Sequence, residues 1–167
     1  TSLATPLQDY VQKKDEIFGW KVVNSHSTGE FTTHYLEFKS QVWQETQWTH
    51  RLNVIEPKPP YSFKYPFLFI TGSGKGEEEI QALGQMAVAL KTPIAILHDV
   101  PNQPLFDGLK EDAIIALTFA KFFETGDPTW PLLFPMTKAA IRAMDVLEAF
   151  AAERTGEKDL SFFVFGG

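Results

Sequence analysis

The C-terminal segment constrains the fold more than any other part of the chain. Residues Phe162 to Phe165 form an apolar run that leads into Gly166 and Gly167. A short apolar run bounded by glycine is typical of a strand that is buried on both faces in a parallel sheet. Glycines directly after such a strand indicate a turn in which side chains must be absent. We therefore expect Phe162 to Phe165 to be a buried strand of a parallel sheet.

Two other short apolar runs, Phe67 to Ile70 and Pro93 to Leu97, predict strands of the same kind. Segments with the periodicity of amphipathic helices lie between and after them: Glu77 to Leu90, Leu109 to Glu124 and Met136 to Ala152. Alternating apolar strands and helices build parallel sheets with right-handed crossovers. The three runs are thus predicted to be adjacent parallel strands, with the first of these helices packed on their sheet.

The first third of the chain has a different pattern. After a polar lead-in with a helical turn around Asp9 to Lys14, three segments alternate between apolar and polar residues: Trp20 to Asn24, Thr32 to Val42 and Trp48 to Ile55. A turn signal at Ser25 to Glu30 separates the first two, and Pro57 ends the third. The fold class is therefore α/β, in one domain over residues 1–167: an antiparallel meander, then parallel strands with crossover helices.

Composition excludes several classes of partner. The net charge is −6 without a cluster of Lys or Arg, so no nucleic acid is expected. No run of apolar residues is long enough for a transmembrane segment, and Thr1 to Tyr10 lacks the pattern of a signal peptide. The absence of Cys excludes disulfides and thiolate metal sites, and His26, His34 and His50 lack the spacing of metal ligands. We expect neither a metal nor a cofactor.

A glycine-rich loop, Gly72 to Gly76, follows the Phe67 to Ile70 strand. It fails the P-loop pattern, because position 69 is Phe and position 76 is Gly, and the acidic run that opens at Glu77 would repel phosphate. Two interpretations remain. The loop is a plain strand-to-helix turn, or its backbone N–H groups at Gly72, Ser73 and Gly74 bind a developing oxyanion.

Polar residues also follow the Pro93 to Leu97 strand. Ligands in open α/β sheets bind outside the carboxyl ends of the strands. This makes four residues candidates for lining a pocket: His98, Asp99, Asn102 and Gln103. The alternative is structural, with the two amides bracing a proline-rich loop and His98 buried with its hydrogen bonds satisfied. For each residue taken alone, the structural interpretation is favoured.

Several segments together resemble the PhoPQ-activated pathogenicity-related protein family, which has an α/β-hydrolase fold. They are Trp48-Thr49-His50 with Pro57, Val100-Pro101-Asn102-Gln103-Pro104-Leu105, Phe134-Pro135-Met136-Thr137-Lys138-Ala139-Ala140, Arg142-Ala143-Met144-Asp145 and Phe163-Val164-Phe165-Gly166-Gly167. The resemblance extends over most of the chain from about Tyr10 onward. Arg142 and Asp145 are also spaced to pair on one helix face.

The resemblance implies an incomplete α/β-hydrolase fold that corresponds to the N-terminal part of a longer protein. In the family, the last strand runs into Gly-x-Ser-Lys-Arg-Gly, and Gly166 and Gly167 match its first two positions. A nucleophilic serine is thus expected just after Gly167, with a histidine and an acid later, for hydrolysis of an ester or amide.

The resemblance also implies an exported protein, periplasmic or secreted, whose first partner is the remainder of the same protein, attached or as a companion fragment. Two alternatives remain: a non-catalytic binding or virulence-associated protein on the same scaffold, and one half of a processed protein. The substrate, small molecule or peptide, stays open.

Overall fold

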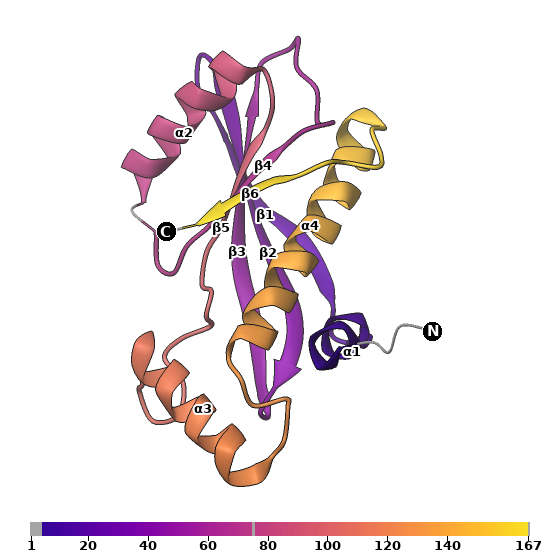
Figure 1. Cartoon of the computed structure of the whole chain (residues 1–167). Coiled ribbons are helices and arrows are strands. Elements are labelled where there is room, and N and C mark those ends of the chain that lie inside the picture. The colour runs from indigo at the N-terminus through magenta and orange to yellow at the C-terminus, as the bar shows by residue number, and fades with distance from the viewer. Residues whose placement is uncertain (1–4, 75, 167) are drawn as a thin grey trace.

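The computed structural model describes residues 5–74 and 76–166 (Figure 1). Along the chain the elements are α1 (Pro6–Gln12), β1 (Gly19–Ser27), β2 (Phe31–Trp43), β3 (Thr46–Pro57), β4 (Phe67–Ile70), α2 (Glu77–Leu90), β5 (Ile94–Leu97), α3 (Asp112–Thr125), α4 (Leu133–Thr155) and β6 (Phe163–Gly166). The strands form one mixed sheet in the order β1-β2-β3-β5-β4-β6.

The sheet has an antiparallel half and a parallel half. β1, β2 and β3 form the predicted meander, and β5 joins β3 in the antiparallel direction. β4 then pairs in parallel with β5 on one side and with β6 on the other. This confirms that Phe67–Ile70, Ile94–Leu97 and Phe163–Gly166 are adjacent parallel strands of one sheet, and with it the α/β fold class.

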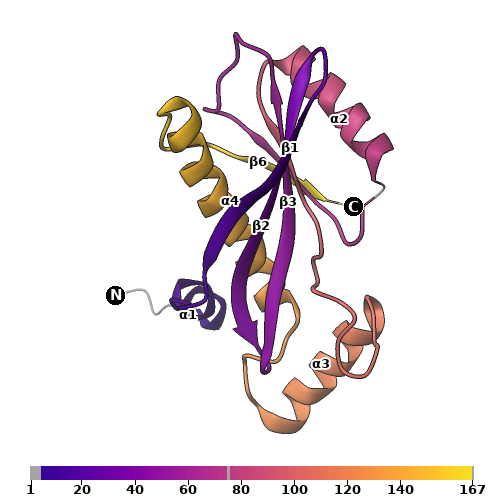
Figure 2. The same cartoon turned by 180° about the vertical axis from the view of Figure 1, so that it is seen from behind.

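A helix covers each face of the sheet, as the two opposite views show (Figures 1 and 2). On one face α4 packs through small and apolar residues, including Ala139, Ala143 and Leu147, against Leu52 and Leu97. The other face carries α2, whose buried residues Ile80 and Ala87 cluster with side chains of the sheet: Phe31, Ile55, Ile94 and Ile96. β5 is buried on both faces, which explains its continuous apolar sequence.

Three helix boundaries differ from the sequence-based prediction. α1 begins at Pro6, where Thr5 and Gln8 form a capping box, and it ends at Gln12 rather than Lys14. α3 begins at Asp112, because the backbones of Leu105 and Leu109 first bond to each other in a tight hairpin. α4 begins at Leu133 and includes Pro135, which is tolerated because N–H groups of the first helical turn have no partner within the helix.

The expected burial of the last strand on both faces is wrong for this structure. β6 lies at the edge of the sheet, and Phe163, Val164 and Phe165 are 55%, 50% and 38% exposed. Phe163 stacks on Phe67 and Phe165 packs on Phe69, with ring centroids 5.0 Å apart in both pairs. Phe67 and Phe69 also pack against the cluster that α2 forms with the sheet, whereas Phe163 and Phe165 stay partly exposed. The strand therefore has the apolar sequence of a central strand in an edge position.

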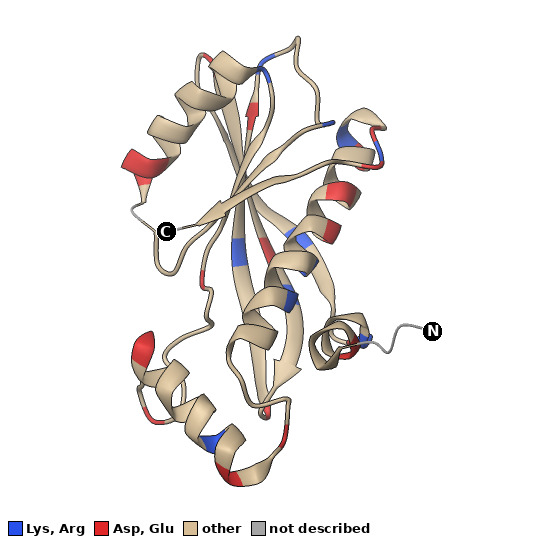
Figure 3. Cartoon of the chain, in the orientation of Figure 1, with Lys and Arg blue, Asp and Glu red and all other residues tan. Residues whose placement is uncertain are grey.

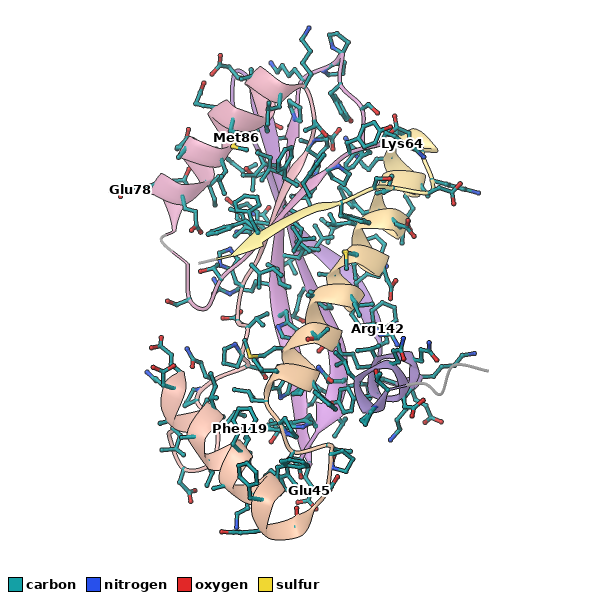
Figure 4. The ribbon with its side chains drawn as sticks, viewed as in Figure 1. Glu45, Lys64, Glu78, Met86, Phe119 and Arg142 are labelled. Carbon is teal, nitrogen blue, oxygen red and sulfur yellow. The ribbon has the colours of Figure 1, made fainter. Side chains whose placement is uncertain are left out.

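Charges of both signs are dispersed over the elements (Figure 3). Arg142, labelled on α4 in Figure 4, forms the predicted bond to Asp145, at 2.8 Å. Phe119, labelled on α3, is 38% exposed, and its neighbour Phe123 is 80% exposed. Among the described residues, no helix combines the length and apolar character needed to cross a membrane.

Candidate functional site

Three strand ends meet at one edge of the sheet. Ile70 at the end of β4 is in register with Leu97 of β5 and with Gly166 of β6. The loop after β4, the loop after β5 and the end of β6 therefore share the carboxyl edge of the parallel strands, which places Gly72 and Ser73 at that edge. Gly167, after which the serine is expected, lies outside the described part of the chain.

Gly166 is held close to β4. A Cβ atom at this position would lie 3.0 Å from the carbonyl oxygen of Ile70. Contacts between a Cβ and a carbonyl oxygen at this distance are too tight for a side chain to be accommodated without displacement. The glycine therefore permits the close approach of β6 to β4 directly before the strand ends.

The glycine-rich loop is bonded to its neighbours through its carbonyl groups. The N–H of Val100 donates to the Thr71 oxygen at 3.3 Å, and the N–H of Asp99 donates to the Gly72 oxygen at 2.7 Å. Nη2 of Arg51 donates to the Ser73 oxygen at 3.3 Å. All three donors come from β3 or from the loop after β5.

The N–H groups of the same loop are turned the other way. In a planar trans peptide the N–H points opposite to the C=O. Since the carbonyls of residues 71–73 accept from Arg51 and from the loop after β5, the N–H groups of Gly72, Ser73 and Gly74 point away from those donors. Within the described residues, these N–H groups have no hydrogen-bond acceptor. The arrangement can bind an anion.

His98 lies beneath this loop and is only 3% exposed. Nδ2 of Asn53 donates to its Nε2 at 3.1 Å, while Nδ1 has no partner among the described residues. Burial, and then the charge of Arg51, lower the pKa of His98, so the ring is neutral at pH 7. A Cβ at Gly74, where φ is +75°, would lie 2.5 Å from the ring. The His98 ring thus packs directly against Gly74.

Arg51 and Asp99 form a two-pronged ion pair beside the loop. Nε of Arg51 donates to Oδ2 at 2.9 Å and Nη2 to Oδ1 at 3.1 Å. The bond to Asp99 raises the pKa of Arg51, so the guanidinium stays charged. Asp99 has a left-handed backbone, with φ of +65°. The Arg51 side chain remains 56% exposed and that of Asp99 31%.

His50 connects Asp99 to the interior. Its Nδ1 donates to the Asp99 carbonyl oxygen at 2.9 Å, and its Nε2 accepts from the Ser40 hydroxyl at 2.9 Å. Burial lowers the pKa of His50 to about 4, although its bonds to the backbone at residues 98 and 99 oppose this shift. The imidazole is therefore neutral. The sequence pattern indicated neither these hydrogen bonds of His50 nor a role for Arg51, although strand alternation places Arg51 and Asn53 on one face.

Asn102 and Gln103 brace the loop that follows β5. Nδ2 of Asn102 donates to the Thr49 carbonyl at 3.0 Å, and Oε1 of Gln103 accepts from the N–H of Glu111 at 2.8 Å. A cavity of about 430 Å³ opens on the α2 face beside the glycine-rich loop, and it is lined by Val23, Tyr35, Leu36, Glu37, Arg51, Asn53, Ser73, Gly76, Glu77, Ile80 and His98. Of the four predicted pocket residues, only His98 belongs to this lining.

A second arginine–carboxylate pair lies on the α4 face of the sheet. Glu56 accepts from Nε and Nη2 of Arg154 at 3.1 and 3.0 Å, from His34 Nε2 at 2.9 Å and from the Tyr61 hydroxyl. Its side chain is 8% exposed. Burial alone would raise the pKa of Glu56, but these donors outweigh it and hold the pKa at about 2. Among the described residues, no His, Asp and Glu side chains group in a way that could hold a metal ion.

Solved structures with a similar fold are esterases. A glucuronoyl esterase from Solibacter usitatus matches 96% of this chain and 50% of its own, with 14% identity and a TM-score of 0.59. A putative acetyl xylan esterase from Bacteroides fragilis matches 96% of this chain and 44% of its own, with 12% identity and a TM-score of 0.57. At this identity the likeness is one of fold, an α/β-hydrolase-type scaffold.

One curated relative is the autocrine proliferation repressor protein A of Dictyostelium discoideum. It is 27% identical over 179 aligned positions, which include 98% of this chain and 36% of the relative. The chain thus spans about a third of the length of this relative. The profile of one protein family matches residues 7–167. On this match, the chain belongs to the PhoPQ-activated pathogenicity-related protein family.

Proposed function

We propose that this chain is the N-terminal portion of a serine hydrolase that cleaves an ester or amide, and that the loop Gly72 to Gly74 supplies its oxyanion donors. The observation that supports the proposal is the direction of three successive peptide groups. Their carbonyls accept from Arg51 and from the loop after β5, which leaves the N–H groups pointing away from those donors. In α/β-hydrolases one oxyanion donor comes from this loop and the other from the residue after the nucleophile.

The proposed mechanism is acyl transfer in two steps. A serine just beyond Gly167 attacks the carbonyl carbon of the substrate while a histidine takes its proton. The carbonyl oxygen becomes negative and is bound by the N–H groups of the loop. The C–O or C–N bond then breaks, the leaving group takes the proton, and water hydrolyses the acyl-serine by the same route. The serine, histidine and acid belong to the sequence expected after Gly167.

Esters of carbohydrates are the first substrates to test. The two similar solved structures are named glucuronoyl esterase and putative acetyl xylan esterase. Their names support an ester over an amide as the bond that is cleaved. A panel should therefore pair acetylated xylan and a glucuronate methyl ester with a peptide amide.

The proposed partner of this chain is the remainder of the same protein, which would cover β6. Three exposed apolar side chains on an edge strand leave backbone groups and phenyl rings in water, which favours pairing or aggregation. Residues 1–167 expressed alone should therefore associate or unfold without cooperativity. Sedimentation and urea unfolding test this, and a soluble, cooperatively folding monomer would contradict it.

The test of the hydrolase uses the protein expressed from its complete gene. A fluorophosphonate probe should label one serine, and peptide mapping should place that serine directly after Gly167. Ser73→Pro removes one N–H and should lower kcat by about 100-fold or more. Ser73→Ala keeps the N–H and should lose far less activity, and melting curves of both variants exclude unfolding as the cause. Absence of both labelling and turnover would refute the proposal.

A non-catalytic binding protein on the same scaffold is the second candidate. The name of the Dictyostelium relative, an autocrine proliferation repressor, describes a regulatory rather than an enzymatic role. It also agrees with the secreted or periplasmic location that the family resemblance implied, which cell fractionation would test. This candidate predicts a protein that remains unlabelled by the fluorophosphonate probe and hydrolyses no member of the ester panel.

A further inference from the structure

Asp99 is bound through every polar group that it has. Its N–H donates to the Gly72 oxygen at 2.7 Å, its carbonyl oxygen accepts from His50 at 2.9 Å, and its carboxylate accepts twice from Arg51. Its backbone is left-handed, with φ of +65°, a conformation that is uncommon outside glycine, although aspartate adopts it more readily than most residues. Such over-determination of an unfavourable backbone is typical of a residue that positions others.

Arg51 extends this arrangement to the next peptide of the loop. The same Nη2 atom that binds Oδ1 of Asp99 also donates to the Ser73 oxygen, at 3.3 Å. Asp99 and Arg51 together therefore hold the carbonyls of two successive residues, Gly72 and Ser73. Those carbonyls belong to the peptide groups whose N–H groups are at Ser73 and Gly74.

We infer that Arg51 and Asp99 are positioning residues, whose ion pair directs the N–H groups of Ser73 and Gly74 toward the oxyanion. The inference rests on the function proposed above and adds two residues to it. Neither side chain would touch the substrate. They act through the Ser73 carbonyl, since a planar peptide cannot rotate its N–H without moving its C=O.

The exposure of the pair argues against a mainly structural role. An ion pair as exposed as this one, at 56% and 31%, contributes about 0–1 kcal/mol to stability. The planar guanidinium can hold both carboxylate oxygens and a third acceptor, which a lysine ammonium cannot do with the same geometry. These properties favour a role for Arg51 in orienting the loop rather than in stabilising the fold.

The test compares three variants of the protein expressed from its complete gene. Arg51→Met and Asp99→Gly each remove the pair, and glycine accepts the left-handed backbone at position 99 without strain. Both should lower kcat by about tenfold or more at nearly constant KM, since a displacement of about 1 Å in an active site has effects of this order or larger. Lys121→Met is the control, because it breaks an exposed ion pair with Glu124 on α3, and neither residue lines the cavity beside the loop.

A double mutant separates positioning from general damage. If Arg51 and Asp99 act as one pair, then combining Arg51→Met with Asp99→Gly should lower kcat little further than either substitution alone. Additive losses in kcat, or equal losses in the Lys121→Met control, would overturn the inference.

Amide hydrogen exchange gives a readout that does not depend on hydrolysis. The N–H groups of residues 99 and 100, which donate to the Gly72 and Thr71 oxygens, should exchange faster in Arg51→Met and Asp99→Gly, and at the wild-type rate in Lys121→Met. Unchanged exchange in the first two variants would refute the positioning role, whatever the activity. If exchange is faster in these two variants but the wild-type protein shows no turnover, the positioning of the loop would be upheld and the proposed hydrolysis refuted.

Discussion

Strand β3 carries one member of each of two arginine–carboxylate pairs, and the pairs differ in almost everything except their chemistry. Glu56 faces α4, is 8% exposed and is also bound by His34 and Tyr61. Arg51 faces the α2 side, and its partner Asp99 is 31% exposed. Both arginines bind their carboxylate through two nitrogens. The two arginines are similarly exposed, at 46% and 56%, so the pairs differ in the burial of the carboxylate and in its further donors. From this difference we expect the Glu56 pair to contribute more to stability, and the Asp99 pair to act mainly on the loop that it contacts.

The matched amide substitutions should separate the two pairs most clearly. Glu56→Gln leaves Arg154 and His34 without a charged partner in a buried site and should lower the free energy of unfolding by about 3 kcal/mol or more. Asp99→Asn makes the same change in an exposed pair and should lower it by less than about 1 kcal/mol. Urea unfolding of both variants measures the two values. Equal losses would remove the distinction between the pairs.

Acid should weaken the protein through His50, which links the exposed pair to the interior. The folded pKa of about 4 lies below the ordinary 6.5, so the unfolded chain binds this proton first. Stability is therefore fully present above pH 6.5 and falls as the pH drops toward 4, by about 3 kcal/mol in all.

The contribution of His50 can be isolated by pH and substitution. The Glu56 contribution, with a pKa of about 2 in the folded state, is lost only below the ordinary carboxyl pKa of 4.5. Unfolding measured between pH 6.5 and 5 thus reports on His50 and on His98, whose pKa is also lowered. His50→Gln should reduce the pH dependence in this range, and parallel curves for variant and wild type would argue against a buried neutral imidazole at position 50.

Packing as well as charge holds the loop beside the exposed pair. Gly74→Ala would place a methyl group against His98 at a position where φ is +75°, and it should lower stability by about 1–3 kcal/mol. Gly156→Ala is the matched control, since φ there is +78° but no atom lies within 4 Å of the added Cβ. Thermal unfolding should show the larger loss at position 74, and equal losses would mean that the His98 contact has no weight.

The salt dependence of stability should distinguish the two ion pairs, with the smallest effect of these tests. In 1 M NaCl charges in solvent are screened over about 3 Å, whereas buried charges are screened much less. The stability difference between wild type and Asp99→Asn, already below about 1 kcal/mol, should then shrink toward zero. The difference for Glu56→Gln should persist. A salt-independent Asp99→Asn effect would indicate that the Asp99 pair behaves as a buried one.

Local pattern predicted the elements of this fold well, because each strand and helix follows a period that is visible in the sequence. β4 and α2 begin and end where the periodicity placed them. The start of α3 was wrong because the Leu105 and Leu109 hairpin has no periodic signal. The predicted burial of β6 was wrong because an apolar sequence shows only that a strand is suited to burial. Its actual exposure depends on the elements that pack beside it.

The site could be predicted only as far as its loops. The position of Gly72 and Ser73 at the carboxyl edge follows from the order of strands and helices. The role of Arg51 does not, since its partner Asp99 is 48 residues away and the two meet only when β3 pairs with β5. Alternation indicated that Arg51 and Asn53 share a face, but nothing local indicated which residues they would face.

The place of β5 in the sheet also bears on the order in which the chain folds. β4 comes first in sequence, yet in the described sheet β5 alone joins it to the meander. The hairpins of β1, β2 and β3 can close through local contacts, whereas the parallel half must wait until β5 inserts between β3 and β4. Substitutions such as Ile96→Val should therefore slow folding, and Val164→Ala in β6 should mainly speed unfolding. Stopped-flow kinetics in urea would reveal whether the pairing of β5 limits the rate at which the sheet assembles.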